Sequence, residues 1–171
     1  MINAIMLFLL LVICVITDMR ERKIYNVVLF PFLLIALIVN SFTGGVQGLG
    51  DALLGMLIGL GILLIPYLMG GMGAGDVKLL AVIGALMGPE FVFLSAVYMA
   101  LVGGAIAILV ILFKKGAKER IRGMVLCILG LLNGLKLPLF QDKAAMQATY
   151  PYGVAIAAGA TIQFFQAGML P

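Results

Sequence analysis

Two adjoining stretches set the architecture of this chain: DALLGMLIGLGILLIPYLM (residues 51–69) and GGMGAGDVK (residues 70–78). The first is apolar and close to the length of about 20 residues that a helix needs to cross a bilayer. The second is a glycine-rich break that ends in Asp76, at the edge of the next apolar segment. An ionisable side chain at the edge of hydrocarbon is costly and is by default a candidate functional residue. The glycines before it allow the backbone to bend and another chain to approach closely.

The rest of the chain is similarly apolar. Of its 171 residues 64% are hydrophobic and 11% are charged, whereas soluble domains are roughly half apolar and a quarter charged. Six stretches approach membrane-spanning length, namely 2–17, 25–42, 51–69, 77–88, 91–113 and 150–168. We therefore predict an all-α polytopic membrane protein with about six transmembrane helices in one bundle. The apolar stretch 123–135 is too short to cross, and we expect it to form an interfacial or partly buried helix.

Small residues recur along these predicted helices. They include Gly55 and Gly59, Gly84 and Gly88, Gly103 and Gly104, and Gly153 and Gly159. Glycine at a helix surface permits close helix packing in lipid. The pattern indicates one compact bundle.

Composition also excludes several classes of function. The chain has no histidine, which excludes Ser–His and Cys–His nucleophile systems. Cys14 and Cys127 lie far apart in apolar segments and form no C-x-x-C pair, so a zinc site is not supported. The net charge of +4 comes from clustered basic residues; it indicates membrane topology rather than nucleic-acid binding.

The positions of lysine and arginine predict the orientation in the membrane. Basic residues occupy the loops after the first and fifth predicted helices: Arg20, Arg22, Lys23, Lys114, Lys115, Lys118, Arg120 and Arg122. The connections near 43–50 and 88–90 contain neither lysine nor arginine. Because cytoplasmic loops carry the excess of positive charge, we predict that the N-terminus lies outside and that the 70–76 loop is cytoplasmic.

This topology sorts the seven acidic residues. Asp18 and Asp76 both lie next to hydrocarbon at the predicted cytoplasmic face. Asp51 and Glu90 begin helices at the opposite face, where we expect Asp51 to act as an N-cap. The other acids lie among basic or polar residues, where a solvated surface is the simpler interpretation: Glu21, Glu119 and Asp142.

Asp18 alone is also explained as a polar helix terminus, and Asp76 alone as an N-cap. Together, with G-x-G directly before Asp76, they predict a pair of carboxyl groups that share one proton. Peptide hydrolysis by such a pair uses one carboxylate to deprotonate water and one carboxylic acid to polarise the scissile carbonyl. The pattern therefore indicates an intramembrane aspartyl protease.

Three motifs carry a resemblance to a known family. They are Gly71-Met72-Gly73-Ala74-Gly75-Asp76-Val77-Lys78, Asp18-Met19-Arg20-Glu21-Arg22-Lys23-Ile24-Tyr25-Asn26 and Tyr150-Pro151-Tyr152-Gly153-Val154-Ala155. The combination resembles the type IV prepilin peptidases, the GxGD-type membrane aspartyl proteases. Tyr25 stands where that family usually has proline.

The resemblance implies catalytic roles for Asp18 and Asp76, and substrate-binding or active-site loop roles for Gly73, Gly75 and Lys78. It implies removal of the basic leader from prepilins or pseudopilins at the cytoplasmic face of the cell membrane. Residues 1–171 would be a single membrane peptidase domain without the N-terminal methyltransferase region. Such a short form is similar to the prepilin peptidases of tight-adherence (Flp) pili. The expected partners are the prepilin and the lipid bilayer, with no metal or organic cofactor.

Alternatives remain at several of these positions. Gly73 and Gly75 are equally explained by a tight turn or by an extended substrate segment beside the loop. Lys78, two residues after Asp76, would not share its helix face, so contact with substrate or phosphate headgroups competes with a catalytic role. A small transporter or channel subunit that uses intramembrane acids is the alternative function, and an inactive pilus-assembly scaffold is a third.

Overall fold

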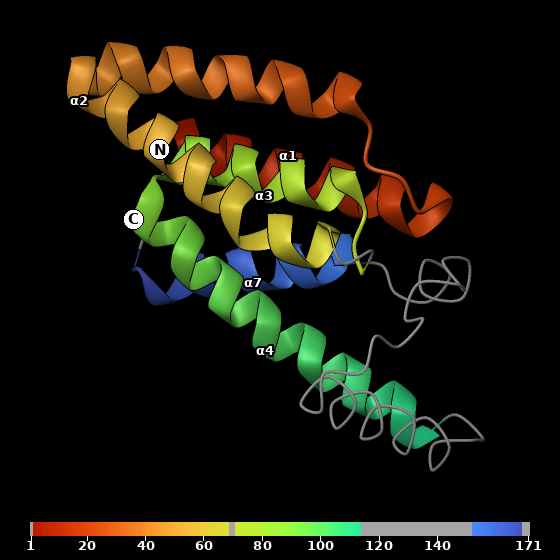
Figure 1. Cartoon of the computed structure of the whole chain (residues 1–171). Helices are drawn as coiled ribbons and strands as arrows, with labels where there is room; N and C mark the ends of the chain where they lie inside the picture. Colours follow the sequence, from red (N-terminus) through yellow and green to blue (C-terminus); the bar gives the residue numbers. More distant parts are fainter. Residues whose placement is uncertain (1, 69–70, 114–151, 169–171) are drawn as a thin grey trace.

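The computed structural model describes residues 2–68, 71–113 and 152–168, and every regular element in these ranges is an α-helix (Figure 1). The helices are α1 (Ile2–Glu21), α2 (Asn26–Leu68), α3 (Ala74–Met87), α4 (Pro89–Phe113) and α7 (Tyr152–Gln166). The predicted all-α class is confirmed. The helix expected over 123–135 lies outside the described residues.

The 43-residue helix α2 consists of two arms joined at Gly45. Gly45 has φ 58° and ψ −141°, a left-handed backbone conformation that glycine adopts without steric cost. The chain doubles back at this point, so that the second arm returns along the bundle (Figure 1). The arms correspond to the separate helices predicted over 25–42 and 51–69. Because the helix resumes directly after Gly45, Asp51 lies inside the second arm, and the prediction that it is an N-cap is wrong.

Within the described residues, three helices are long and apolar enough to cross a membrane, in agreement with a membrane protein: α1, α2 and the Pro89–Ile106 part of α4. The number of about six spans is not established. Helix α3 has only 14 residues, about 21 Å at 1.5 Å per residue, whereas the hydrocarbon core is about 30 Å thick. Ten of its residues are buried. Neighbouring helices, rather than lipid, therefore surround most of this short helix.

Glycines bring α2 and α3 into direct backbone contact. A Cβ added to Gly55 would lie 2.1 Å from the carbonyl oxygen of Gly84, and one added to Gly59 would lie 2.5 Å from that of Leu80. Real Cβ atoms do not approach other atoms this closely. The predicted role of these glycines in close helix packing is confirmed for this helix pair.

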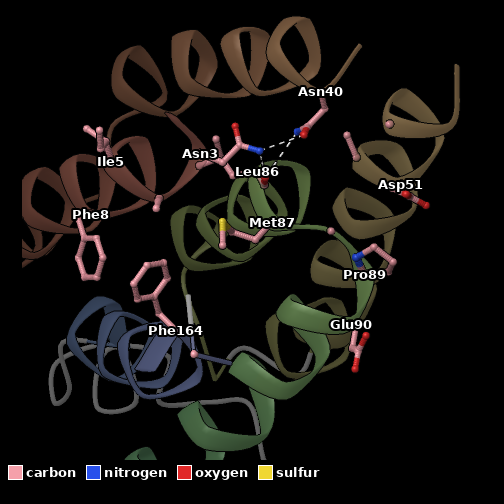
Figure 2. Close-up of a pocket in the computed structure, with 15 residues that line it drawn as sticks. Asn3, Ile5, Phe8, Asn40, Asp51, Leu86, Met87, Pro89, Glu90 and Phe164 are labelled. Carbon is pink, nitrogen blue, oxygen red and sulfur yellow. Dashed lines mark hydrogen bonds between the residues drawn. The ribbon is translucent and has the colours of Figure 1, made fainter. Parts of the chain in front are cut away.

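Two asparagines connect three helices at one end of the bundle (Figure 2). Nδ2 of Asn3 in α1 donates to Oδ1 of Asn40 in α2 at 3.0 Å and to the carbonyl oxygen of Leu86 in α3 at 2.9 Å. These residues line a cavity of about 910 Å³ together with the exposed acids Asp51 and Glu90. Asp18 and Asp76 lie at the other ends of these helices, Asp18 in the last turn of α1 and Asp76 in the first turn of α3.

Candidate active site

Asp18 and Asp76 line a single pocket, although they belong to different helices. Asp18 lies in the last turn of α1 and Asp76 in the first turn of α3. The pocket has a volume of about 330 Å³ and is lined by Asp18, Arg22, Lys23, Ile24, Tyr25, Asn26, Gly73, Ala74, Gly75 and Asp76. The structure therefore brings together the two carboxyl groups that the sequence singled out, with the glycine-rich segment beside them.

The carboxyl group of Asp76 is fixed by the start of its own helix. Gly73 is the N-cap residue of α3, and its N–H donates to Oδ2 of Asp76 at 3.1 Å. Asp76 is thus the acidic N3 residue of a capping box, three residues after the N-cap, and is not the N-cap itself. The side chain of Asp76 is 8% exposed. Asp76 therefore both stabilises the helix start and presents a buried carboxyl group to the pocket.

Asp76 lies just before the predicted span 77–88. Its surroundings favour the protonated form of its carboxyl group. Burial raises the pKa of Asp76 to about 6, and the nearby charge of Asp18 acts in the same direction. The hydrogen bond from Gly73 opposes this rise. A carboxyl group of this kind is suited to hold a proton that a fully solvated aspartate would lose.

Asp18 is fixed from a distant part of the chain. Its side chain is 6% exposed, and its Oδ2 accepts a hydrogen bond of 2.9 Å from the N–H of Gly153, at the start of α7. Sequence reasoning missed this contact. The available signal is the Pro151-Tyr152-Gly153 run at the beginning of the last apolar stretch, where a glycine enters the first turn of a helix.

Gly75 is required by close packing rather than by an unusual backbone angle. The glycines with positive φ in the described residues are Gly45, Gly88 and Gly168, so Gly75 is not among them. A Cβ at Gly75 would lie 2.9 Å from Cβ of Ile24 and 3.3 Å from its carbonyl oxygen. Gly75 therefore lets the first turn of α3 approach the segment between α1 and α2.

Lys78 is not among the residues that line the pocket of the two carboxyl groups. Its Nζ donates to Oδ1 of Asn26 at 2.9 Å. It contributes to a neighbouring apolar cavity of about 450 Å³ between α3 and both arms of α2, lined by Asn26, Leu29, Phe30, Leu33, Met56, Leu60, Lys78, Ala81 and Val82. Lys78 therefore contacts a residue of the pocket lining, and its predicted role in the active-site loop stays a prediction. Asn26, the last residue of the motif that begins at Asp18, lines both cavities.

The fold and the pocket define a helical membrane protein with two buried carboxyl groups at one site. Within the described ranges, no group of three or more histidine, cysteine, aspartate or glutamate side chains is arranged to hold a metal ion.

Comparison with known proteins identifies the family. The model of the type IV leader peptidase family matches residues 5–109, a range that contains both aspartates and the glycine-rich segment. The chain belongs to this family. It is also 34% identical over 112 residues to the prepilin leader peptidase/N-methyltransferase of Bacillus subtilis (strain 168). The aligned region covers 62% of this chain and 44% of that protein, so the chain spans less than half of this relative's length. No solved structure matches.

Proposed function

We propose that this protein is an aspartic endopeptidase that removes the basic leader peptide from type IV prepilins or pseudopilins at the cytoplasmic membrane face. The observation that carries the proposal is the shared pocket of Asp18 and Asp76, both buried and both within the range matched by the leader peptidase family. The similarity to the prepilin leader peptidase/N-methyltransferase of Bacillus subtilis supports the substrate class.

The pair performs acid–base catalysis with one shared proton. We assign the shared proton to Asp76, because burial and the nearby charge of Asp18 favour its protonated form, and Asp18 is the carboxylate that accepts a proton from the attacking water. The water oxygen bonds to the scissile carbonyl carbon while Asp76 protonates the carbonyl oxygen. As the tetrahedral intermediate collapses, the C–N bond breaks, Asp18 gives its proton to the leaving amine nitrogen, and a hydroxyl group of the intermediate returns a proton to Asp76, which restores the pair.

The distribution of charge supports the proposed orientation. All four basic residues in the described ranges lie at the end of the bundle that holds the pocket: Arg20, Arg22, Lys23 and Lys78. The opposite end carries Asp51 and Glu90. An excess of lysine and arginine on one side is typical of the cytoplasmic face.

The alternative of a transporter or channel subunit receives less support. Carriers place their coupling ions and acids near the bilayer midplane. Asp18 lies three residues before the end of α1, and Asp76 lies two residues after the start of α3. Both carboxyl groups are thus at helix ends, where a peptide that approaches from the cytoplasm reaches them.

The test is cleavage of a prepilin by the purified protein in lipid nanodiscs, with the cut mapped by mass spectrometry. Asp18→Asn and Asp76→Asn should each abolish cleavage, and the double variant should be no worse, because residues that act as a unit are not additive. Asp51→Asn, at the opposite end of the bundle, is the matched control and should cleave normally. If Asp18→Asn or Asp76→Asn cleaves prepilin at the wild-type rate, the mechanism is refuted.

A further inference from the structure

The first turn of α7 touches the carboxyl group of Asp18 directly. Gly153 is buried, and its N–H donates to Oδ2 of Asp18 from 135 residues away along the chain. A Cβ built on Gly153 would lie 2.6 Å from that oxygen and 3.0 Å from Cγ of Asp18. The Asp18 side chain therefore occupies the space that any larger residue at position 153 would need.

This contact has a clear physical basis. The first N–H groups of a helix have no acceptor within the helix, and a carboxylate at a helix N-terminus is stabilised both by these donors and by the helix dipole. Hydrogen bonds from N–H to a carboxylate are stronger than those between neutral groups. Asp18 satisfies the start of α7, and α7 in turn fixes the direction of the Asp18 carboxylate.

A second contact holds α7 in register with α1. The rings of Phe8 in α1 and Phe164 in α7 meet edge to face, with centroids 4.9 Å apart (Figure 2). Phe8 precedes Asp18 in α1, whereas Phe164 follows Gly153 in α7. The two helices are therefore antiparallel, and the aromatic pair keeps the start of α7 level with Asp18.

We propose that Gly153 is a positioning residue of the active site, whose backbone N–H orients the Asp18 carboxylate and whose lack of a side chain leaves room for it. This inference rests on the proposed function. It adds a component from outside residues 5–109, the range that the family model matches. The catalytic residues remain Asp18 and Asp76, and Gly153 acts through Asp18.

Gly159 on the same helix is a control position, because its contacts are those of ordinary helix packing. A Cβ at Gly159 would lie 2.5 Å from the backbone N of Met99 and 2.6 Å from the carbonyl oxygen of Ser95, both in α4. Its neighbours are rigid backbone atoms of another helix. The nearest neighbour of Gly153 is instead the end of a side chain, which can rotate away. Substitution of Gly153 should therefore displace Asp18 with little loss of stability, whereas substitution of Gly159 should weaken the contact between α4 and α7.

The first experiment tests the proximity without measuring activity. A Cβ at position 153 would lie 3.2 Å from Cβ of Asp18, slightly less than the roughly 3.5–4.5 Å typical of a disulfide. The variant Asp18→Cys/Gly153→Cys, made with both native cysteines replaced by serine, should form an intramolecular disulfide on mild oxidation. Asp18→Cys/Thr161→Cys, about 12 Å further along α7 at 1.5 Å per residue, should not. If Asp18→Cys/Gly153→Cys stays reduced, the contact between the two positions is refuted.

The second experiment measures kcat and KM for prepilin cleavage in nanodiscs. Gly153→Ala should lower kcat by roughly tenfold or more with KM unchanged and the melting temperature close to that of the wild type. Gly159→Ala should lower the melting temperature. A merely structural role for Gly153 would lower the melting temperature of Gly153→Ala as well, and that result would overturn the proposal.

Incorporation of glycolic acid in place of Gly153 during cell-free synthesis replaces the amide by an ester, which removes the donor and adds no atom. This variant should also lose roughly tenfold in kcat, as expected for a hydrogen bond to a charged group. If the ester variant keeps the wild-type kcat, the positioning role of the N–H is refuted. A wild-type protein that cleaves no prepilin would refute the proposed function. A cleaving wild-type enzyme whose Gly153→Ala variant keeps its kcat would refute this inference alone.

Discussion

Gly59 and Gly61 lie two residues apart in the second arm of α2. Replacement by alanine should lower the free energy of unfolding at Gly59 and raise it at Gly61. Gly59 is buried against α3, whereas Gly61 is exposed and has no atom within 4 Å of the position of an added Cβ. Gly59→Ala would place its Cβ 2.5 Å from the carbonyl oxygen of Leu80 and 2.8 Å from the carbonyl carbon. Since ordinary contact begins at 3.4 Å, α2 and α3 must part locally by about 0.9 Å, the difference between the two distances.

The energetic cost follows from this separation. A gap of about 0.5–1 Å forfeits roughly a quarter to a half of the dispersion attraction between the atoms concerned. Overpacking of a well-packed site costs about 1–3 kcal/mol. We expect Gly59→Ala to lower the free energy of unfolding by about 2 kcal/mol, which corresponds to a melting temperature roughly 4–8 °C lower. Gly61→Ala adds no contact and should stabilise the helix by up to about 1 kcal/mol through helix propensity.

The assay is thermal unfolding of the two variants in the same detergent, followed by circular dichroism at the helix band. Prepilin cleavage should fall in Gly59→Ala as well, because Leu80 lies one turn after Asp76 on α3. Equal melting temperatures for the two variants would refute the argument, since the same substitution on the same helix differs only in what the new methyl group meets.

Three further predictions concern the pocket and its orientation. Gly75→Val should reduce prepilin cleavage by roughly tenfold or more with a smaller effect on thermal stability, because its Cβ would lie 2.9 Å from that of Ile24; an unchanged cleavage rate would contradict this. Because the pKa of Asp76 is raised from 3.8 to about 6, kcat should decline as pH rises through about 6. The wild-type free energy of unfolding should also fall as pH rises from about 4 to about 6, with a contribution from Asp76 of at most about 3 kcal/mol, and Asp76→Asn should show a smaller fall. A cysteine at Thr43 should react with an impermeant label from outside intact cells and one at Ala117 should not; the reverse pattern would place the pocket on the wrong side.

Part of the fold and of the site was predictable because it depends on local composition. Apolar length predicted the helical segments, including the two arms that α2 joins at Gly45. The basic residues after α1 and the glycine-rich break before α3 placed Asp18 and Asp76 at one end, and the shared pocket agrees with that placement. The prediction on Ala117 concerns a position outside the described residues.

The rest depends on geometry that the sequence does not express. Asp51 follows a glycine and reads as an N-cap, but the backbone of Gly45 starts the second arm earlier. Lys78 belongs to the same motif as Asp76, yet its position on the helix directs it to Asn26. Gly59 and Gly61 have the same local surroundings in the sequence, and only the position of α3 distinguishes them.

The hydrogen bond between Asp18 and Gly153 also has a consequence for the order of events during synthesis. The ribosome produces α1 first, and α1 enters the membrane with Asp18 before the start of α7 has been translated. Until residue 153 has been added and α7 has packed beside α1, the Asp18 carboxylate lacks the donor that orients it. A nascent chain that already contains both aspartates therefore still lacks this donor, and under the proposed function we expect peptidase activity only after the first and last described helices have met.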